Sequence, residues 1–162
     1  MGFTKLFILI FFNPFHFCNN DTTKYIAPDE LSLSIHQYPM KQITEYIIDY
    51  KSIKVRFTNR NQGFDSVIIK KTVRSGHLKK LFGYMNSFEK ERYYNQCIED
   101  GQIMTLLFTN KTVVLKKVRF SNYYDKHLEQ IIKFINQHVG SKYSILYDKN
   151  KLISDFENCK NQ

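Results

Sequence analysis

Apolar residues alternate with polar ones from Ile43 onward, and this pattern predicts the first strands of the fold. Five apolar residues over 43–57 stand at odd-numbered positions: Ile43, Ile47, Ile53, Val55 and Phe57. A period of two is expected for a β-strand. Tyr46 and Tyr50 also fit a helical face with Ile43, but β-branched and aromatic residues favour a strand. A turn at 59–63 and a second strand over 64–73 follow.

Two segments have helical spacing instead. Residues 75–88 carry apolar side chains at intervals of three and four, after a serine that can cap a helix: Leu78, Leu81, Phe82, Met85 and Phe88. Residues 125–140 carry a second stripe, between a capping Asp125 and a terminating Gly140: Leu128, Ile131, Ile132, Ile135 and Val139. Both segments are predicted to be amphipathic helices.

A hairpin is predicted between these helices, with its turn at Asn110-Lys111. Residues 142–148 are predicted to form a last strand and residues 151–159 a last helical turn or two. The predicted order is β-β-α-β-β-α-β. We therefore expect an α+β fold, an antiparallel sheet of four to five strands with two amphipathic helices packed on one face.

The N-terminal region differs in composition from the rest. Lys5 precedes seven consecutive apolar residues, which are too few to span a membrane, and Pro14 follows them. These are the parts of an export signal. We therefore divide the chain into a signal over residues 1–18, a tether and extended lead-in over 19–42, and a single α+β domain over 43–162.

Cys18 resembles the lipidated cysteine that ends a bacterial lipoprotein signal. The length of the apolar run and the single cysteine carry this resemblance, whereas Phe17 stands where that family has a small residue. The resemblance implies lipidation at Cys18 and a membrane tether. A cleaved signal without a lipid, a buried first element of the fold and a misassigned start codon are the alternatives.

The other two cysteines suggest a structural bond. If Cys18 is lipidated or removed, Cys97 and Cys159 remain as a pair. Such a pair is usually oxidised to a disulfide in exported proteins, so we predict a Cys97–Cys159 disulfide. Two unrelated thiols are the alternative.

Motifs for metal binding or catalysis are missing from the sequence. The five histidines lack metal-ligand spacing, and the chain has no nucleophile elbow and no phosphate-binding glycine loop. Acidic neighbours of Cys97 oppose thiolate chemistry. We expect no cofactor, no metal site and no enzymatic activity.

The net charge of +9 permits an acidic partner, although a soluble surface with codon-driven lysine is the simpler explanation of such a charge. We predict a small exported binding or envelope-structural protein, located in the periplasm, the outer envelope or outside the cell. Its partner, an acidic protein or envelope component, would contact the solvent face of the sheet at Arg56, Lys70, Lys116 and Arg119. The alternative is a cytoplasmic basic protein that binds nucleic acid or inhibits another protein, and an export signal argues against nucleic acid.

Overall fold

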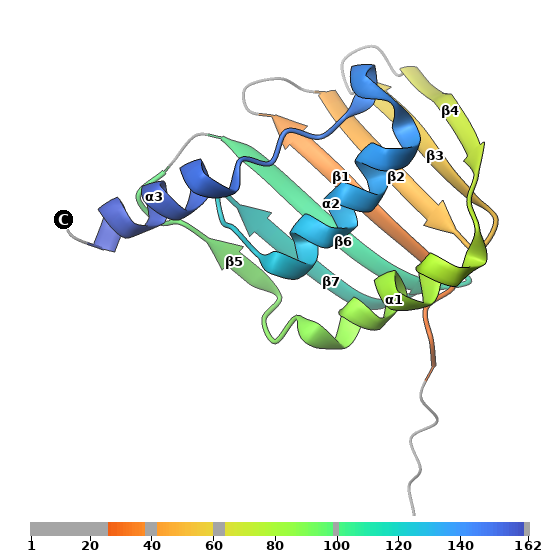
Figure 1. Cartoon of the computed structure of the whole chain (residues 1–162), viewed down its shortest axis with the longest axis horizontal. Helices are drawn as coiled ribbons and strands as arrows, with labels where there is room; N and C mark the ends of the chain where they lie inside the picture. The colour runs from red at the N-terminus through yellow and green to blue at the C-terminus, as the bar shows by residue number, and fades with distance from the viewer. Residues whose placement is uncertain (1–25, 38–41, 60–63, 99–100, 161–162) are drawn as a thin grey trace, which may run out of the picture.

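The computed structural model describes residues 26–37, 42–59, 64–98 and 101–160. Its strands are β1 (Glu30–Gln37), β2 (Gln42–Asp49), β3 (Ser52–Asn59), β4 (Phe64–Thr72), β5 (Arg92–Tyr94), β6 (Gln102–Asn110) and β7 (Val113–Ser121). Its α-helices are α1 (Leu78–Gly83), α2 (Lys126–Val139) and α3 (Lys149–Lys160). The seven strands form one sheet in the order β4-β3-β2-β1-β6-β7-β5 (Figure 1).

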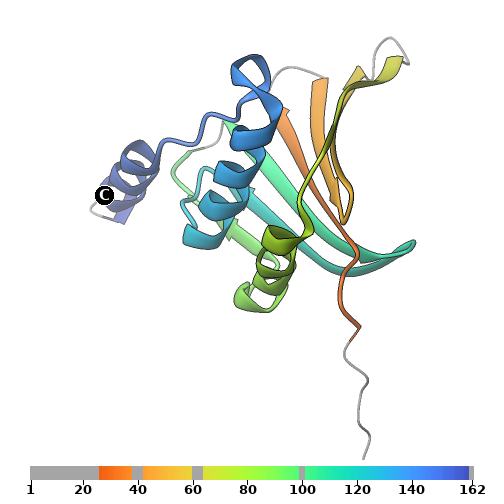
Figure 2. The same ribbon diagram turned by 45° about the vertical axis from the view of Figure 1, so that its right-hand side comes forward.

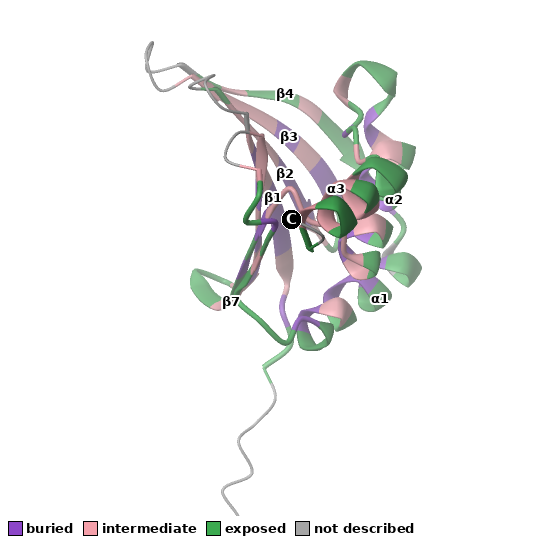
Figure 3. Ribbon diagram, turned by 90° about the vertical axis from the view of Figure 1, so that its left-hand side faces the viewer, coloured by how far each residue is buried: buried purple, intermediate pink, exposed green. Residues whose placement is uncertain are grey.

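The helices α1 and α2 cover one face of this sheet and leave the other face open (Figures 2 and 3). All neighbouring strands are antiparallel except β5 and β7, which are parallel. The core lies between the sheet and the two helices, where Phe88 packs against Phe108 and Phe120. An α+β fold is therefore confirmed, and the described residues form three α-helices in place of two and seven strands in place of four or five.

The two strands that the sequence analysis missed are β1 and β5. Strand β1 lies in the middle of the sheet, where Leu31 and Leu33 are fully buried and Ser32 and Ser34 point to the other face. The segment 19–42, predicted to be a tether and lead-in, thus contains the central strand. The folded unit begins before Ile43, because β2 and β6 both hydrogen-bond to β1.

The single strand predicted over residues 43–57 is two strands joined by a tight turn. The Asp49 carboxylate accepts hydrogen bonds from the backbone N–H groups of Lys51 and Ser52, at 2.8 and 2.7 Å. A short acidic side chain that bonds the backbone two or three residues ahead favours a turn. The chain therefore reverses at Tyr50-Lys51, and β3 pairs with β2.

The helix predicted over 125–140 is confirmed as α2. Asp125 Oδ1 accepts from the N–H groups of His127 and Leu128 at 2.8 and 2.9 Å, and this caps the helix. Gly140 ends it with a φ of 81°, a conformation that favours glycine. The helix predicted over 75–88 is shorter, because 3₁₀ turns at Ser75–His77 and Tyr84–Ser87 flank α1.

The strand predicted over 142–148 is absent, since this part of the described chain has no neighbouring strand. The side chain of Asn136 on α2 makes the hydrogen bonds that a neighbouring strand would otherwise make. Its Oδ1 accepts from Ile145 N–H at 2.7 Å and its Nδ2 donates to Ile145 C=O at 2.9 Å. An amide side chain thus satisfies the backbone of an isolated extended segment whose Ile145 side chain is buried.

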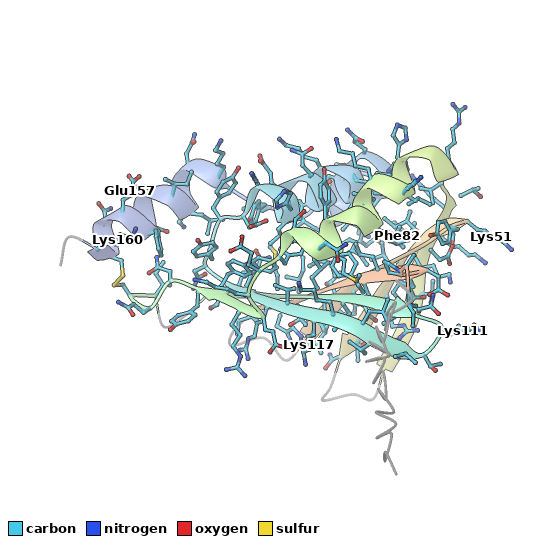
Figure 4. All side chains as sticks on the ribbon, turned by 90° about the horizontal axis from the view of Figure 1, so that it is seen from below. Lys51, Phe82, Lys111, Lys117, Glu157 and Lys160 are labelled. Carbon is cyan, nitrogen blue, oxygen red and sulfur yellow. A yellow bond between two sulfur atoms is a disulfide. The ribbon has the colours of Figure 1, made fainter. Side chains whose placement is uncertain are left out.

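The disulfide between Cys97 and Cys159 is present in the structure, with the two Cα atoms 5.6 Å apart. It joins the segment after β5 to the end of α3, and Figure 4 shows it close to Lys160. Asn95 orients Cys97, because its Oδ1 accepts from Cys97 N–H at 3.1 Å. The helix α3 has no buried residue, so this bond is its strongest attachment to the domain.

The predicted signal over residues 1–18, including Cys18, lies outside the described residues. Among the helices that the structure describes, none combines the length and the apolar character needed to cross a membrane.

We expect the replacement of both cysteines by serine (C97S/C159S) to release α3 and leave the sheet folded. The reason is that α3 buries no residue, whereas six residues of α2 are buried in the core. Hydrogen exchange measured by mass spectrometry should show faster exchange over Lys149–Lys160 and unchanged protection over α2 and β6. A uniform loss of protection throughout the chain would contradict this prediction.

Candidate partner-binding face

The open face is the surface of the sheet that α1 and α2 leave uncovered. Residues directly opposite each other on neighbouring strands share a face, so the register aligns side chains in rows across it. One row runs from β4 to β7 as Lys70, Lys54, Ile47, Ser32, Leu107 and Lys117. The next runs from β4 to β5 as Val67, Arg56, Glu45, Ser34, Thr105, Arg119 and Arg92.

The half of this face formed by β1 to β4 is electrostatically balanced. Lys54 pairs with Asp49 at 3.1 Å, and Arg56 lies 3.5 Å from Glu45 and 3.6 Å from Asp65. Adding Lys70 and Glu30 gives three cations against four carboxylates in this half. Because the arginine and one lysine already have acidic neighbours, an acidic partner gains little by contacting them.

The carboxylates at the turn end of this half differ in environment. Burial acts to raise the pKa of Asp49, but hydrogen bonds from Lys51, Lys54 and Ser52 outweigh it and lower the pKa below 3.8. Burial raises the pKa of the neighbouring Glu30, although Lys54 acts in the opposite direction. The hydrogen bonds that hold Asp49 ionised also stabilise the β2–β3 turn.

The half formed by β7 and β5 carries cations without acidic partners. We call Lys117, Arg119 and Arg92 the basic edge. All three are exposed, and the register places Arg119 directly opposite Arg92. None of the three forms an ion pair with a carboxylate in the described part of the chain. Two adjacent guanidinium groups and an ammonium group therefore face solvent together, and this arrangement favours an anion.

The structure separates the four residues predicted as partner contacts. Arg56 and Lys70 lie on the balanced half, and Arg119 lies on the basic edge. Lys116 is on the opposite face, because it pairs in register with the buried Phe108 and its ammonium donates to the Phe88 carbonyl. Lys117 takes its place on the open face, and Figure 4 shows this side chain on the side away from the helices.

The sequence alone could have assigned Lys117 to the open face of the sheet, but it could not have assigned Arg92 to it. In the second half of β7, the apolar residues Val118 and Phe120 alternate with Lys117 and Arg119. The parity of this half therefore assigns Lys116 to the core face and Lys117 with Arg119 to the open face. Arg92 lies in a strand of three residues. Such a strand is too short to show a period.

Metal binding finds no support in the described residues, where no group of three or more His, Cys, Asp and Glu side chains could hold an ion. Comparison with protein-family models, with curated proteins and with solved structures finds no match to this chain.

We expect Asp49→Asn to lower the free energy of unfolding at pH 7 by about 1.5–3 kcal/mol, the usual range for hydrogen bonds to a charged group. Since the pKa of Asp49 is lowered in the folded protein, its stabilisation is complete above pH 3.8 and declines as the pH falls further. Urea unfolding at pH 7 and at pH 3 should therefore show a large difference from wild type only at pH 7.

The matched control is Asp65→Asn, which removes the same charge from an exposed carboxylate of β4. We expect it to change the free energy of unfolding by less than about 1 kcal/mol at pH 7. Equal effects of the two substitutions would show that overall charge, and not the turn, determines the stability.

Proposed function

We propose that the protein is an exported, non-catalytic binding module that receives an acidic partner on the open face of its sheet. The observation that carries this proposal is the basic edge, three exposed cations that no described carboxylate neutralises. Charges that are already paired on the balanced half contribute little, so the partner would be recognised mainly along β7 and β5.

The compartment is supported by the disulfide. A Cys97–Cys159 bond is compatible with an oxidising environment outside the cytoplasm. The apolar run before Cys18 supports export independently of the bond. We propose Cys18 as the point of lipid attachment if the exported protein is tethered to a membrane.

Charge reversal at the basic edge (K117E/R119E) should weaken binding to an acidic polymer. With fluorescein-labelled poly-L-glutamate as the probe, we expect an apparent affinity about tenfold lower, because two favourable charge contacts become repulsive. Fluorescence anisotropy at several salt concentrations measures the affinity, and the difference from wild type should shrink at high salt.

The control for this experiment is K71E/K79E, which makes the same change in net charge. Lys71 is exposed at the end of β4, at the other end of the strand order from β7. Lys79 is exposed on α1, which covers the opposite face of the sheet (Figure 2). We expect this variant to bind nearly as well as wild type. An equal loss in both variants would mean that net charge alone attracts the probe and would overturn the proposed face.

Mass analysis of the N-terminus after cell fractionation tests the compartment. We expect the mature chain to start at or near Cys18, and a tethered form to carry a diacylglyceryl mass on that residue. Recovery of the chain with Met1 intact in the cytosol would contradict export. That result would favour the alternative of a cytoplasmic basic protein that binds nucleic acid or inhibits another protein.

A further inference from the structure

Among the described residues, strand β5 has no neighbouring strand along one edge, which we call its free edge. It lies at the end of the sheet and pairs with β7 in parallel. The residues on either side of β5 also bond to β7: Glu91 C=O accepts from Arg119 N–H at 2.8 Å, and Asn95 N–H donates to Ser121 C=O at 3.1 Å. In a parallel pair, alternate residues direct both backbone groups to the same neighbour. The N–H and C=O groups of Arg92 and Tyr94 therefore point away from β7.

These backbone groups lie beside a cleft of about 320 Å³. Strand β5 and the chain next to it form one wall, and the last turns of α3 form the other, held there by the disulfide. Figure 1 shows α3 beside the chain that follows β5. The residues lining the cleft are Lys90, Arg92, Tyr93, Tyr94, Gln96, Tyr123, Phe156, Cys159 and Lys160.

The two sides of the cleft differ in chemistry. On the open-face side, Arg92 continues the row of Arg119. On the helix side, three rings pack together: Tyr93 and Tyr123 have centroids 5.5 Å apart, and Tyr123 and Phe156 5.3 Å apart. Lys160 lies over the Phe156 ring at 4.6 Å. The open-face side thus favours carboxylates, and the helix side favours apolar side chains.

We propose that an extended segment of the partner protein adds to the sheet along the free edge of β5. Side chains of a strand alternate between faces, so the segment would have acidic residues facing Arg92 and Arg119 and apolar residues facing Tyr93 and Phe156. This inference rests on the proposed function and names the partner chemistry, an alternating acidic and apolar β-strand.

A protein segment fits this edge better than a polyanion without amides. The outward N–H and C=O groups of Arg92 and Tyr94 offer up to four hydrogen bonds to another backbone, and main-chain bonding is the source of affinity in strand addition. The edge of β4 is less suitable. Lys70 and Lys71 are consecutive exposed residues there, and lysines on an edge discourage strand pairing.

The test uses an eight-residue fluorescein-labelled peptide of alternating Glu and Val, and two isomers N-methylated on either all Glu or all Val amides. Only one set of amides faces β5 in an added strand. We expect one isomer to bind at least about tenfold more weakly than the parent peptide, and the other to bind nearly as well. Loss on Glu methylation indicates antiparallel addition, and loss on Val methylation indicates parallel addition.

Two protein variants complete the test. Tyr94→Pro removes an outward N–H group from an edge strand, where proline is tolerated. This variant should bind the parent peptide with about tenfold lower affinity. Thermal unfolding checks that this variant is folded. R92E should lower the affinity for the parent peptide. Lys71→Glu, a matched charge reversal on β4, should leave that affinity unchanged.

The outcomes separate this inference from the proposed function. Strand addition is wrong if both methylated isomers bind equally. It is also wrong if a sulfated oligosaccharide displaces the peptide while Tyr94→Pro has no effect on peptide affinity. In either case the proposal of an acidic partner stands. If neither the peptide nor poly-L-glutamate binding depends on Lys117, Arg119 and Arg92, the proposed function fails as well.

Discussion

Strand β1 is hydrogen-bonded to β2 on one side and to β6 on the other, and the two halves of the described sheet are joined through it. Its inward residues Leu31, Leu33 and Ile35 are buried. Because side chains in a strand alternate strictly, fixing these three toward the helices fixes the face of every residue paired with them. A shift of one residue would exchange the core face with the open face throughout both halves.

The charge pattern of the open face follows from this register. The same pairing that buries Leu106 opposite Leu33 places Thr105 between Ser34 and Arg119, and so separates Arg119 from the acidic residues of β2. Glu45 lies instead beside Arg56. The chain thus carries nearly all the acidic groups of this face on one half, and the cations of the other half are left to solvent or to a partner.

The sequence predicted the elements in which a single period is sustained, and it failed where a neighbour decides the structure. The hairpin over 102–121 and the helix α2 combine apolar periodicity with recognisable ends. Residues 142–148 look like a strand but are held by the Asn136 amide. Apolar and polar residues alternate over 31–36 as regularly as in any strand. The prolines at 28 and 39 and the polar residues at 19–23 nevertheless favour an irregular lead-in. The disulfide followed from counting cysteines, whereas the basic edge required knowing that β5 pairs with β7.

The disulfide explains how a helix without buried residues can remain beside an edge strand. Packing holds α3 only weakly, because the helix has no buried residue and touches the domain through contacts such as that between the Phe156 and Tyr123 rings. A bond that closes a loop across a separation of 62 residues lowers the entropy of the unfolded chain by an amount equivalent to about 4 kcal/mol. It also keeps Lys160 and Phe156 next to β5 without covering the strand. A helix that packed tightly here would bury the free edge, so covalent attachment in place of a hydrophobic interface leaves that edge accessible.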